Sequence, residues 1–455
     1  MGKNYDFEYI IIGSGPAGRT IATKLATAKK SVAVVECENF GGAEINTRDY
    51  PYEIALNFAH TYHDFIKSPA VNDNSCHFNY PTFLSHMEQL ITRARSDIVE
   101  SLQSQNIKLI SGFAHFLDSN TIAVDEHQYT AKYFILATGS VLKAAEISGL
   151  DNIKYLDPET ALFTHRLPKF VFIVGGGPTG VQLAEYFAML GTGVIIMERG
   201  THLLPREDEE VANAITDYFT SELGITVVTN SRVTALTEDY SSKIVVFSNG
   251  SSEKMVRVDS IILSTGSEPY LDYGLENAGV DYKRTGINVD KYFNTSAKNI
   301  FAIGDCVKDA DSSTEHAILE ANTLAANLLH RQKLSAHYNG LSRYVNIKQS
   351  VATIGMNERD ILSRDLKCRK SLVYLRDIPS LHAPEYKYGF IKLLTDHSGK
   401  LLGASIVAPN ADLLIGELSM AMRNRLSIES LASTSHPASS PALAITAAAR
   451  KLLTK

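Results

Sequence analysis

The chain has 455 residues, of which 44% are hydrophobic and 21% are charged, a composition that is ordinary for a globular protein of roughly two to four domains. Its net charge of -6 argues against nucleic-acid binding, and no apolar run reaches the roughly 18 residues of a membrane helix. The four cysteines lack zinc-type spacing, so we expect no metal site. The sequence predicts a cytoplasmic protein without a signal peptide.

The first predicted element is a strand that enters the glycine-rich turn GSGPAG at residues 13–18. A helix-like segment and a second strand follow, and this strand ends at Glu36. Gly13 permits a tight turn, Gly15 lets the backbone approach a pyrophosphate, and Gly18 lets the helix pack close to the strand. This order of elements predicts a dinucleotide-binding unit in which Glu36 accepts hydrogen bonds from ribose hydroxyls.

The same order of elements returns in the middle of the chain, where a strand enters GGGPTG at residues 175–180. Gly175, Gly177 and Gly180 hold the three glycine positions, and the next strand ends at Glu198. Two such units in one chain predict two dinucleotides, a bound FAD and a diffusing nicotinamide nucleotide.

Glu198 indicates which nicotinamide nucleotide is preferred. A carboxylate at this position suits the 2′-hydroxyl of NADH and repels the 2′-phosphate of NADPH, so we expect NADH to be preferred. Arg199 and Arg206 are close in sequence and keep NADPH open as an alternative.

Three further segments complete the expected nucleotide sites. Two strands end in Thr-Gly-Ser, which places Gly139 and Gly266 at their carboxyl ends. A third strand ends at Asp305, where an acid can hold a ribityl hydroxyl of FAD. The helix that follows carries Ala317, and its N-terminus can face the pyrimidine end of the flavin.

Together these motifs resemble the pyridine nucleotide-disulfide oxidoreductases, which include dihydrolipoamide dehydrogenase, glutathione reductase, mercuric reductase and the soluble transhydrogenase. The resemblance covers nearly the whole chain and implies an α/β protein with two Rossmann-like dinucleotide-binding domains and a C-terminal α+β dimerisation domain. It implies a homodimer that binds FAD and NAD(P). The implied domains are FAD-binding over 1–150, NAD(P)-binding over 151–270, a return to the FAD-binding domain over 271–335, and dimerisation over 336–455.

The chain departs from the family at the redox segment. The family pattern GGTCxNxGCxPSK reads GGAEINTRDYPYE here, so Gly42 is kept while Glu44 and Asp49 stand at the two cysteine positions. Glu53 stands where the family has a lysine beside the flavin, and it shares a face with Asp49 if the helix is kept. Without two thiols, electrons cannot pass to a disulfide by thiolate exchange, which disfavours disulfide and lipoamide reduction.

Two more positions of the resemblance have changed. Gln182 replaces the glutamate that pairs with the family's lysine, and Pro441 replaces the acid that orients the retained His436. In one interpretation Glu44, Asp49 and His436 of the partner subunit form a polar pocket for a new substrate or a proton relay. In the other, these positions drifted after selection for disulfide chemistry ended. The candidate catalytic residues are therefore Glu44, Asp49, Glu53, Gln182 and His436.

The cysteines provide no evident substitute for the missing pair. Cys306 directly follows Asp305, and Cys37 directly follows Glu36. We expect both to be structural, because a free cysteine commonly packs as a small apolar residue. No two cysteines are close enough in sequence to suggest a second redox disulfide.

The sequence leaves several functions open. The first is a flavoenzyme that passes electrons from NADH through FAD to another nicotinamide, a quinone, a dye or oxygen, with the soluble transhydrogenase as the nearest functional parallel. The second is a sensor that binds the nucleotides without turnover, which Pro178 and Ser267 favour because they alter where the nicotinamide stacks. The third is a specialised enzyme whose substrate the sequence does not name. An inert structural paralogue is a weaker alternative.

Overall fold

The computed structural model describes residues 4–68, 70–71, 78–143, 145–240, 242–250, 252–310 and 313–454, and Cys76 lies outside them. The chain forms two compact units, and each is assembled from three separate segments. The segments of the first unit are Met1–Tyr52, Thr82–Ala144 and Gly266–Tyr338. Those of the second unit are Glu53–Pro81, Ala145–Thr265 and Asn339–Lys455.

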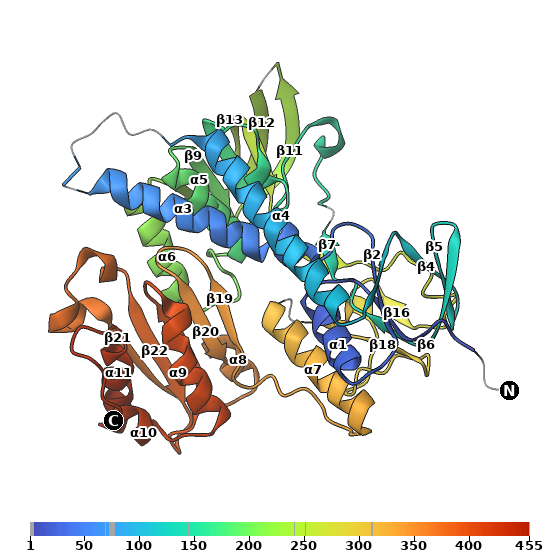
Figure 1. The fold of residues 1–455 in the computed structure, drawn as a ribbon. Coiled ribbons are helices and arrows are strands. Elements are labelled where there is room, and N and C mark those ends of the chain that lie inside the picture. Colours follow the sequence, from blue (N-terminus) through green and yellow to red (C-terminus); the bar gives the residue numbers. More distant parts are fainter. Residues whose placement is uncertain are drawn as a thin grey trace. The chain divides into compact units, whose positions relative to one another are not determined.

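The first unit is built on a seven-stranded sheet (Figure 1). Its strands are β1 (Phe7–Ile12), β2 (Val32–Glu36), β3 (Lys108–Ser111), β4 (Ala114–Asp118), β5 (Thr121–Val124), β6 (His127–Leu136) and β18 (Ile300–Ala302). The order is β3-β2-β1-β6-β5-β4, and β18 pairs with the second half of β6. The pairs among β3, β2, β1, β6 and β18 are parallel, whereas β4, β5 and the start of β6 form an antiparallel meander.

Helices cover one face of this parallel sheet. They are α1 (Pro16–Thr27), α4 (Tyr80–Ser104) and α7 (Thr314–His330). The short helix α2 (Gly42–Asn46) also belongs to this unit, and α3 (Asp49–Lys67) starts in it. Side chains of β1 alternate between two cores: Tyr9 and Ile11 pack with α1 and α7, while Ile10 and Ile12 pack on the opposite face. Both faces of β1 are therefore apolar, which explains its nearly continuous hydrophobic sequence.

Short elements complete the first unit. Strand β7 (Ser140–Leu142) pairs with β15 (Ser267–Pro269), and β16 (Tyr282–Lys283) pairs with β17 (Gly286–Ile287). The 3₁₀ turn η3 (Gly304–Cys306) follows β18 directly. These elements place the carboxyl ends of β6 and β18 beside the β7–β15 ribbon.

The second unit contains a four-stranded parallel sheet of order β10-β9-β8-β14. These strands are β8 (Phe170–Val174), β9 (Gly193–Met197), β10 (Thr226–Val228) and β14 (Ser260–Leu263), and the helices α5 (Pro178–Met189) and α6 (Glu209–Glu222) connect them. A three-stranded antiparallel sheet follows in chain order: β11 (Arg232–Asp239), β12 (Ser242–Asn249) and β13 (Ser252–Val258). The short 3₁₀ helices of this unit are η1 (Leu150–Asn152), η2 (Ala161–Phe163), η4 (Leu375–Asp377), η5 (Pro379–Leu381) and η6 (Pro384–Tyr386).

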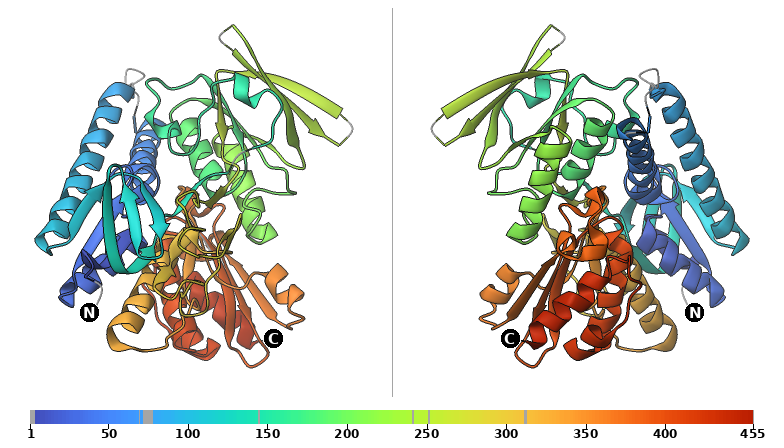
Figure 2. Two further views of the ribbon diagram at one scale, coloured as in Figure 1. Left: turned by 90° about the vertical axis from the view of Figure 1, so that its right-hand side faces the viewer. Right: turned by 90° about the vertical axis from the view of Figure 1, so that its left-hand side faces the viewer.

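The C-terminal part of the second unit is an antiparallel sheet covered by helices. The strands are β19 (Ser342–Val345), β20 (Val351–Gly355), β21 (Arg369–Tyr374), β22 (Phe390–Thr395) and β23 (Leu401–Val407), in the order β19-β20-β23-β22-β21. The helices are α8 (Glu358–Ser363), α9 (Ala411–Arg423), α10 (Ile428–Ser433) and α11 (Leu443–Leu453). Helices α9 and α11 lie on one face of the sheet (Figure 2), where alternate strand residues form one apolar core with them.

The predicted α/β class with two dinucleotide-type sheets and a C-terminal α+β part is confirmed. Among the described residues, no helix has both the length and the apolar character needed to cross a membrane.

Candidate functional site

The two glycine-rich turns have the same backbone geometry. Gly13 and Gly175 have φ angles of 102° and 113°, which residues with a Cβ rarely adopt. A Cβ on Gly18 would lie 2.0 Å from the carbonyl oxygen of Gly13, and one on Gly180 would lie 2.0 Å from that of Gly175. The tight turn and the close packing of helix on strand that the sequence predicts are both present twice.

The middle glycines face open space at the helix starts. Gly15 is the N-cap of α1 and Gly177 is the N-cap of α5, and no described side chain caps either helix. A Cβ at either glycine would meet no protein atom within 4 Å. The N–H groups and the positive end of each helix dipole can therefore receive a phosphate, so both turns fit a dinucleotide. Both helices begin inside the glycine-rich motifs, at Pro16 and Pro178, because proline suits the first helical position.

The two strand-end acids are tied to their own glycine turns. Glu36 accepts hydrogen bonds on Oε2 from the backbone N (2.9 Å) and Oγ (2.6 Å) of Ser14. Glu198 accepts from the backbone N of Gly176 on Oε2 and of Gly200 on Oε1, both at 2.8 Å. Both carboxylates are buried and lie at the end of the second strand, where the ribose of a dinucleotide would approach.

Other residues predicted to bind FAD gather near the first turn. A Cβ on Gly42 would lie 2.6 Å from Cα of Gly15, so the start of α2 is in contact with that turn. Gly139 has a φ of 70°, and the next residue, Ser140, donates a hydrogen bond from Oγ to Oδ2 of Asp305 (3.0 Å). The carboxyl ends of β6 and β18 are thereby joined.

Ala317 and Gly266 also belong to the first unit. Ala317 is buried on α7, and a Cβ on Gly304 would lie 3.8 Å from its Cβ. Gly266 precedes β15, and its carbonyl accepts a hydrogen bond from the backbone N of Lys143 (3.0 Å). Gly266 therefore lies beside the β7–β15 ribbon, in a different unit from Gly175.

Glu44, at the first former cysteine position, is paired with an arginine. It lies on α2, and its Oε2 contacts the guanidinium of Arg19 on α1. Both side chains are 23% exposed. Burial raises the pKa of Glu44, Arg19 opposes this effect, and the negative charges of Asp49 and Glu315 add to it.

Asp49, at the second former cysteine position, is the first residue of α3. Its Oδ2 accepts a hydrogen bond from Oγ1 of Thr314, the first residue of α7, at 2.7 Å. The residue as a whole is exposed to solvent, but protein atoms surround much of its carboxylate. This partial desolvation and the negative charge of Glu315 raise the pKa of Asp49. The hydrogen bond from Thr314 and the positive charge of Arg48 oppose the rise.

Glu53 and Gln182 belong to the second unit. Glu53 lies on α3 one turn after Asp49, and it accepts hydrogen bonds from Nδ2 of Asn57 (2.8 Å) and Nδ2 of Asn346 (2.6 Å). Gln182 is half-buried on α5. Within the described part of the chain, no polar contact joins Glu53 to Gln182, so the family's pair is not replaced by another pair at the same positions.

A contact between a histidine and a carboxylate, which the sequence did not predict, links α3 to α5 further along. Nε2 of His60 lies 2.7 Å from Oε2 of Glu185, which is fully buried and one turn beyond Gln182. Glu185 also accepts hydrogen bonds from the hydroxyl of Tyr218 and from the backbone N of Lys348, each at 3.0 Å. The only local sequence signal was an acid on the apolar face of a predicted helix.

The structure changes the expectation for His436. The sequence predicts that it lacks an orienting acid, because Pro441 holds that position. Instead, Nε2 of His436 lies 2.9 Å from Oε2 of Glu417 on α9, and Nδ1 lies 2.9 Å from Oγ1 of Thr446 on α11. The carboxylate comes from α9 and not from the segment that holds Pro441. Packing of α9 against the C-terminal sheet brings it close to the histidine.

The described cysteines are free thiols. Cys306 is fully buried, its Sγ donates to the carbonyl of Ile303 (3.3 Å), and burial raises its pKa to about 12. Burial and the neighbouring Glu36 raise the pKa of Cys37 to about 11. Both thiols therefore stay protonated near neutral pH and are poor nucleophiles. Cys368 is also unpaired.

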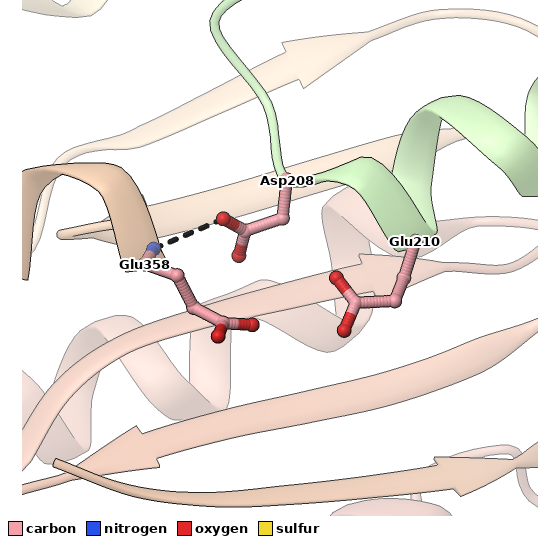
Figure 3. A group of neighbouring side chains, drawn as sticks. All are labelled: Asp208, Glu210 and Glu358. Carbon is pink, nitrogen blue, oxygen red and sulfur yellow. Dashed lines mark hydrogen bonds between the residues drawn. The ribbon is translucent and has the colours of Figure 1, made fainter.

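A cluster of three carboxylates in the second unit is occupied by a lysine. Figure 3 shows Asp208, Glu210 and Glu358 turned toward one another, with the backbone N of Glu358 donating to Oδ1 of Asp208 (2.9 Å). Nζ of Lys392 lies 2.9 Å from Oδ2 of Asp208 and 2.7 Å from Oε2 of Glu210, and it also contacts Glu358. The lysine ammonium stands where a metal cation would bind, so the cluster is an ion-pair network.

Comparison with known proteins identifies relatives along the whole chain. A family model described as pyridine nucleotide-disulphide oxidoreductase matches residues 7–321, and the model of that family's dimerisation domain matches residues 342–449. The chain is 28% identical over 449 residues to a mercuric reductase of Bacillus cereus, with 95% of this chain and 69% of the relative covered. It is 27% identical over 441 residues to a dihydrolipoyl dehydrogenase of Bacillus subtilis (strain 168), with 94% and 92% covered.

A solved structure agrees with the fold. The HOCl-induced flavoprotein disulfide reductase RclA from Escherichia coli superposes with a TM-score of 0.87 at 24% identity, and the match covers 98% of this chain and 99% of that chain. At this identity the likeness supports the fold alone.

Proposed function

The chain belongs to the pyridine nucleotide-disulphide oxidoreductase family, and we propose that it is an FAD-dependent enzyme that oxidises NADH and reduces a small acceptor other than a disulfide. The observation that carries this proposal is the presence of Glu44 and Asp49 at the two cysteine positions of the family. Carboxylates cannot exchange with a disulfide, and the described cysteines are unpaired thiols with no partner sulfur. The nucleotide-binding turns are intact, which favours an altered acceptor over loss of the redox cycle.

The proposed roles of the FAD site follow from its geometry. FAD, when bound, supplies the two-electron chemistry, while the protein binds and orients it. The start of α1 at Gly15 would receive the diphosphate, and Glu36 would hold the adenosine ribose. Asp305, whose position is set by the hydrogen bond from Ser140, would hold the ribityl chain. Gly13, Gly18 and Gly42 would shape the site through their close backbone packing, while Gly139, where a Cβ meets no protein atom within 4 Å, would leave space beside the cofactor. Ala317, on the helix that follows Asp305, would lie at the flavin end of the site.

Glu198 supports a preference for NADH. Each of its carboxylate oxygens accepts a backbone N–H, from Gly176 and from Gly200, so the side chain cannot easily turn away from a 2′-phosphate. Each oxygen keeps a lone pair with which to accept a ribose hydroxyl. The start of α5 at Gly177 would receive the diphosphate of the nicotinamide nucleotide, beside Gly175 and Gly180. Gly266 stays a weaker candidate because it lies in the other unit.

An anaerobic titration with NADH, and with NADPH in parallel, tests the proposed function. One equivalent of NADH per FAD is expected to bleach the flavin absorbance, because the cysteines in the described part of the chain form no disulfide that could take up a second pair of electrons. NADPH is expected to be less effective, because Glu198 repels its 2′-phosphate. If the flavin is present and reducible by dithionite but not by either nucleotide, the proposal fails and a sensor without turnover becomes the better description.

Glu53 is expected to lower the reduction potential of the flavin relative to relatives that have a lysine at this position. A carboxylate disfavours an anionic reduced flavin, and a lysine favours it. We expect Glu53→Lys to raise the two-electron potential by tens of millivolts, at ~30 mV for each ~1.4 kcal/mol of charge stabilisation. Redox potentiometry measures this shift. Glu53→Gln removes the charge alone and should give a smaller rise, and an unchanged potential in both variants would show that Glu53 does not act on the flavin.

The match to the family's dimerisation domain supports a homodimer. Large apolar side chains on α9, Leu413 and Met420, are exposed in the single chain and are separated by two helical turns. Sedimentation of the purified protein at micromolar concentration would test this assembly, and a monomer would contradict it.

A further inference from the structure

We propose that Asp49, and not Glu44, is the residue that gives a proton to the acceptor in this reaction. The inference rests on the proposed function, because it concerns the step in which a non-disulfide acceptor is reduced. It separates two carboxylates that the sequence treats alike, since each stands at one of the two former cysteine positions.

Glu44 is already committed to a charge pair. Its Oε2 contacts the guanidinium of Arg19, which lies on α1 in the first turn after the glycine-rich loop. This contact ties α2 to α1, and Nε of Arg19 is itself buried without a described partner. Protonating Glu44 would leave a partly buried guanidinium without its counter-ion, which costs free energy. Glu44 is therefore suited to hold the charge of Arg19 rather than to gain and lose a proton.

Asp49 has a partner that suits both of its protonation states. The hydroxyl of Thr314 donates to the carboxylate at 2.7 Å, and a hydroxyl can equally accept a hydrogen bond from a protonated acid. The charged groups that act on Asp49 are Glu315 on α7, Glu44 on α2 and the adjacent Arg48. The guanidinium of Arg48 contacts Oγ and the carbonyl oxygen of Ser140, at 3.4 and 3.3 Å.

Access and charge also favour Asp49. It is open to solvent, so water can return a proton after each turnover, whereas Glu44 is partly buried. Burial and Glu315 favour the protonated form of both carboxylates, but the guanidinium of Arg19, which opposes this effect, is in direct contact with Glu44. An acid whose pKa is raised toward the working pH and that solvent can reach has the properties of a general acid.

The step balances for a quinone-like acceptor. With FAD bound, the cofactor would supply a hydride to the acceptor, and the carboxyl group of Asp49 would give the proton that completes the hydroquinone. Asp49 is left as a carboxylate and takes a proton from water. Over one cycle, NADH, one proton and a quinone become NAD⁺ and a hydroquinone. Ferricyanide takes single electrons and no proton, so its reduction does not need Asp49.

The test compares two variants and two acceptors in the purified holoenzyme. Asp49→Asn keeps a hydrogen-bonding group beside Thr314 but has no proton to transfer. It is expected to lower benzoquinone turnover about a hundredfold relative to ferricyanide turnover, within the range of general acid catalysis. Glu44→Gln is the matched control at the other former cysteine position. It is expected to change both turnover rates together, so that their ratio stays at the native value.

A second readout does not depend on turnover. A carboxylate whose pKa is raised by folding makes the folded state less stable as it ionises. Asp49→Asn is therefore expected to be more stable than the native protein at pH 8 in urea denaturation, with the difference shrinking toward pH 4. A native turnover ratio in Asp49→Asn, or a lowered ratio in Glu44→Gln, would overturn the inference. Failure of the proposed function can be told apart from failure of this inference. It would show in the native protein, whose flavin NADH would then not bleach.

Discussion

Replacing Lys392 with methionine is expected to lower the free energy of unfolding by about 3–5 kcal/mol, the usual cost of removing one partner from a buried ion pair. The lysine is fully buried on β22, and its ammonium contacts Asp208, Glu210 and Glu358. These carboxylates come from the start of α6 and the start of α8. Without the ammonium, three negative charges are left close together at the place where these elements meet β22. Urea denaturation at neutral pH measures the loss.

Lys370→Met is the matched control for this prediction. Lys370 contacts two of the same carboxylates, Glu210 at 3.1 Å and Glu358 at 2.8 Å, but its side chain is 43% exposed. An exposed pair contributes little, so we expect a loss below about 1 kcal/mol. Equal losses in the two variants would show that burial of Lys392 is not what makes its ion pairs important.

The same cluster predicts a dependence on acid. Burial alone would raise the pKa of Glu210, but hydrogen bonds from Lys392 and Lys370 lower it from 4.5 to about 2. A carboxylate with a lower pKa in the folded state stabilises the protein above its unfolded pKa, and this contribution is lost as the pH falls toward the folded pKa. The native protein should therefore lose stability between about pH 5 and pH 2. Lys392→Met should lose less over this range, because Lys392 is the larger of the two causes of the lowered pKa.

Alanine at the two middle glycines is expected to separate the two nucleotide sites. A Cβ at Gly15 or Gly177 meets no protein atom within 4 Å, but it would project where a diphosphate must approach. Overpacking of about 1–3 kcal/mol corresponds to roughly tenfold to hundredfold weaker binding. Gly15→Ala should weaken FAD binding, whereas Gly177→Ala should leave FAD in place and weaken NADH binding. Titration of the apoprotein with FAD, and of the holoprotein with NADH, measures the two effects.

The free energy of unfolding of the apoprotein is the control measurement for these variants. Both glycines are N-caps with negative φ angles, so alanine should cost the apoprotein no more than about 1 kcal/mol. Gly18→Ala is different, because its Cβ would lie 2.0 Å from the carbonyl oxygen of Gly13 and the turn itself would have to move. Unchanged FAD affinity in Gly15→Ala would mean that the diphosphate does not approach this turn.

The sequence by itself predicted the features that follow local rules. A strand that ends in a glycine with positive φ, a helix that starts at proline, and an acid at the end of the next strand are each specified within about 25 residues. The nearly continuous apolar run of β1 and the spacing of the glycines need no knowledge of distant segments. The fold class and the positions of both nucleotide motifs were predictable for this reason, whereas the domain boundaries and the roles of individual site residues stay predictions.

Only the tertiary structure decided how the charged side chains are paired. Asp49 meets Thr314 across 265 positions of sequence, and His60 meets Glu185 across 125. Glu417 reaches His436 from another helix, although the position that the family uses for this acid holds proline. A side-chain pair of this kind depends on which faces of two elements pack together, and no local pattern carries that information. The sequence therefore showed that the disulfide is missing, and the packing showed which charged groups now surround its two positions.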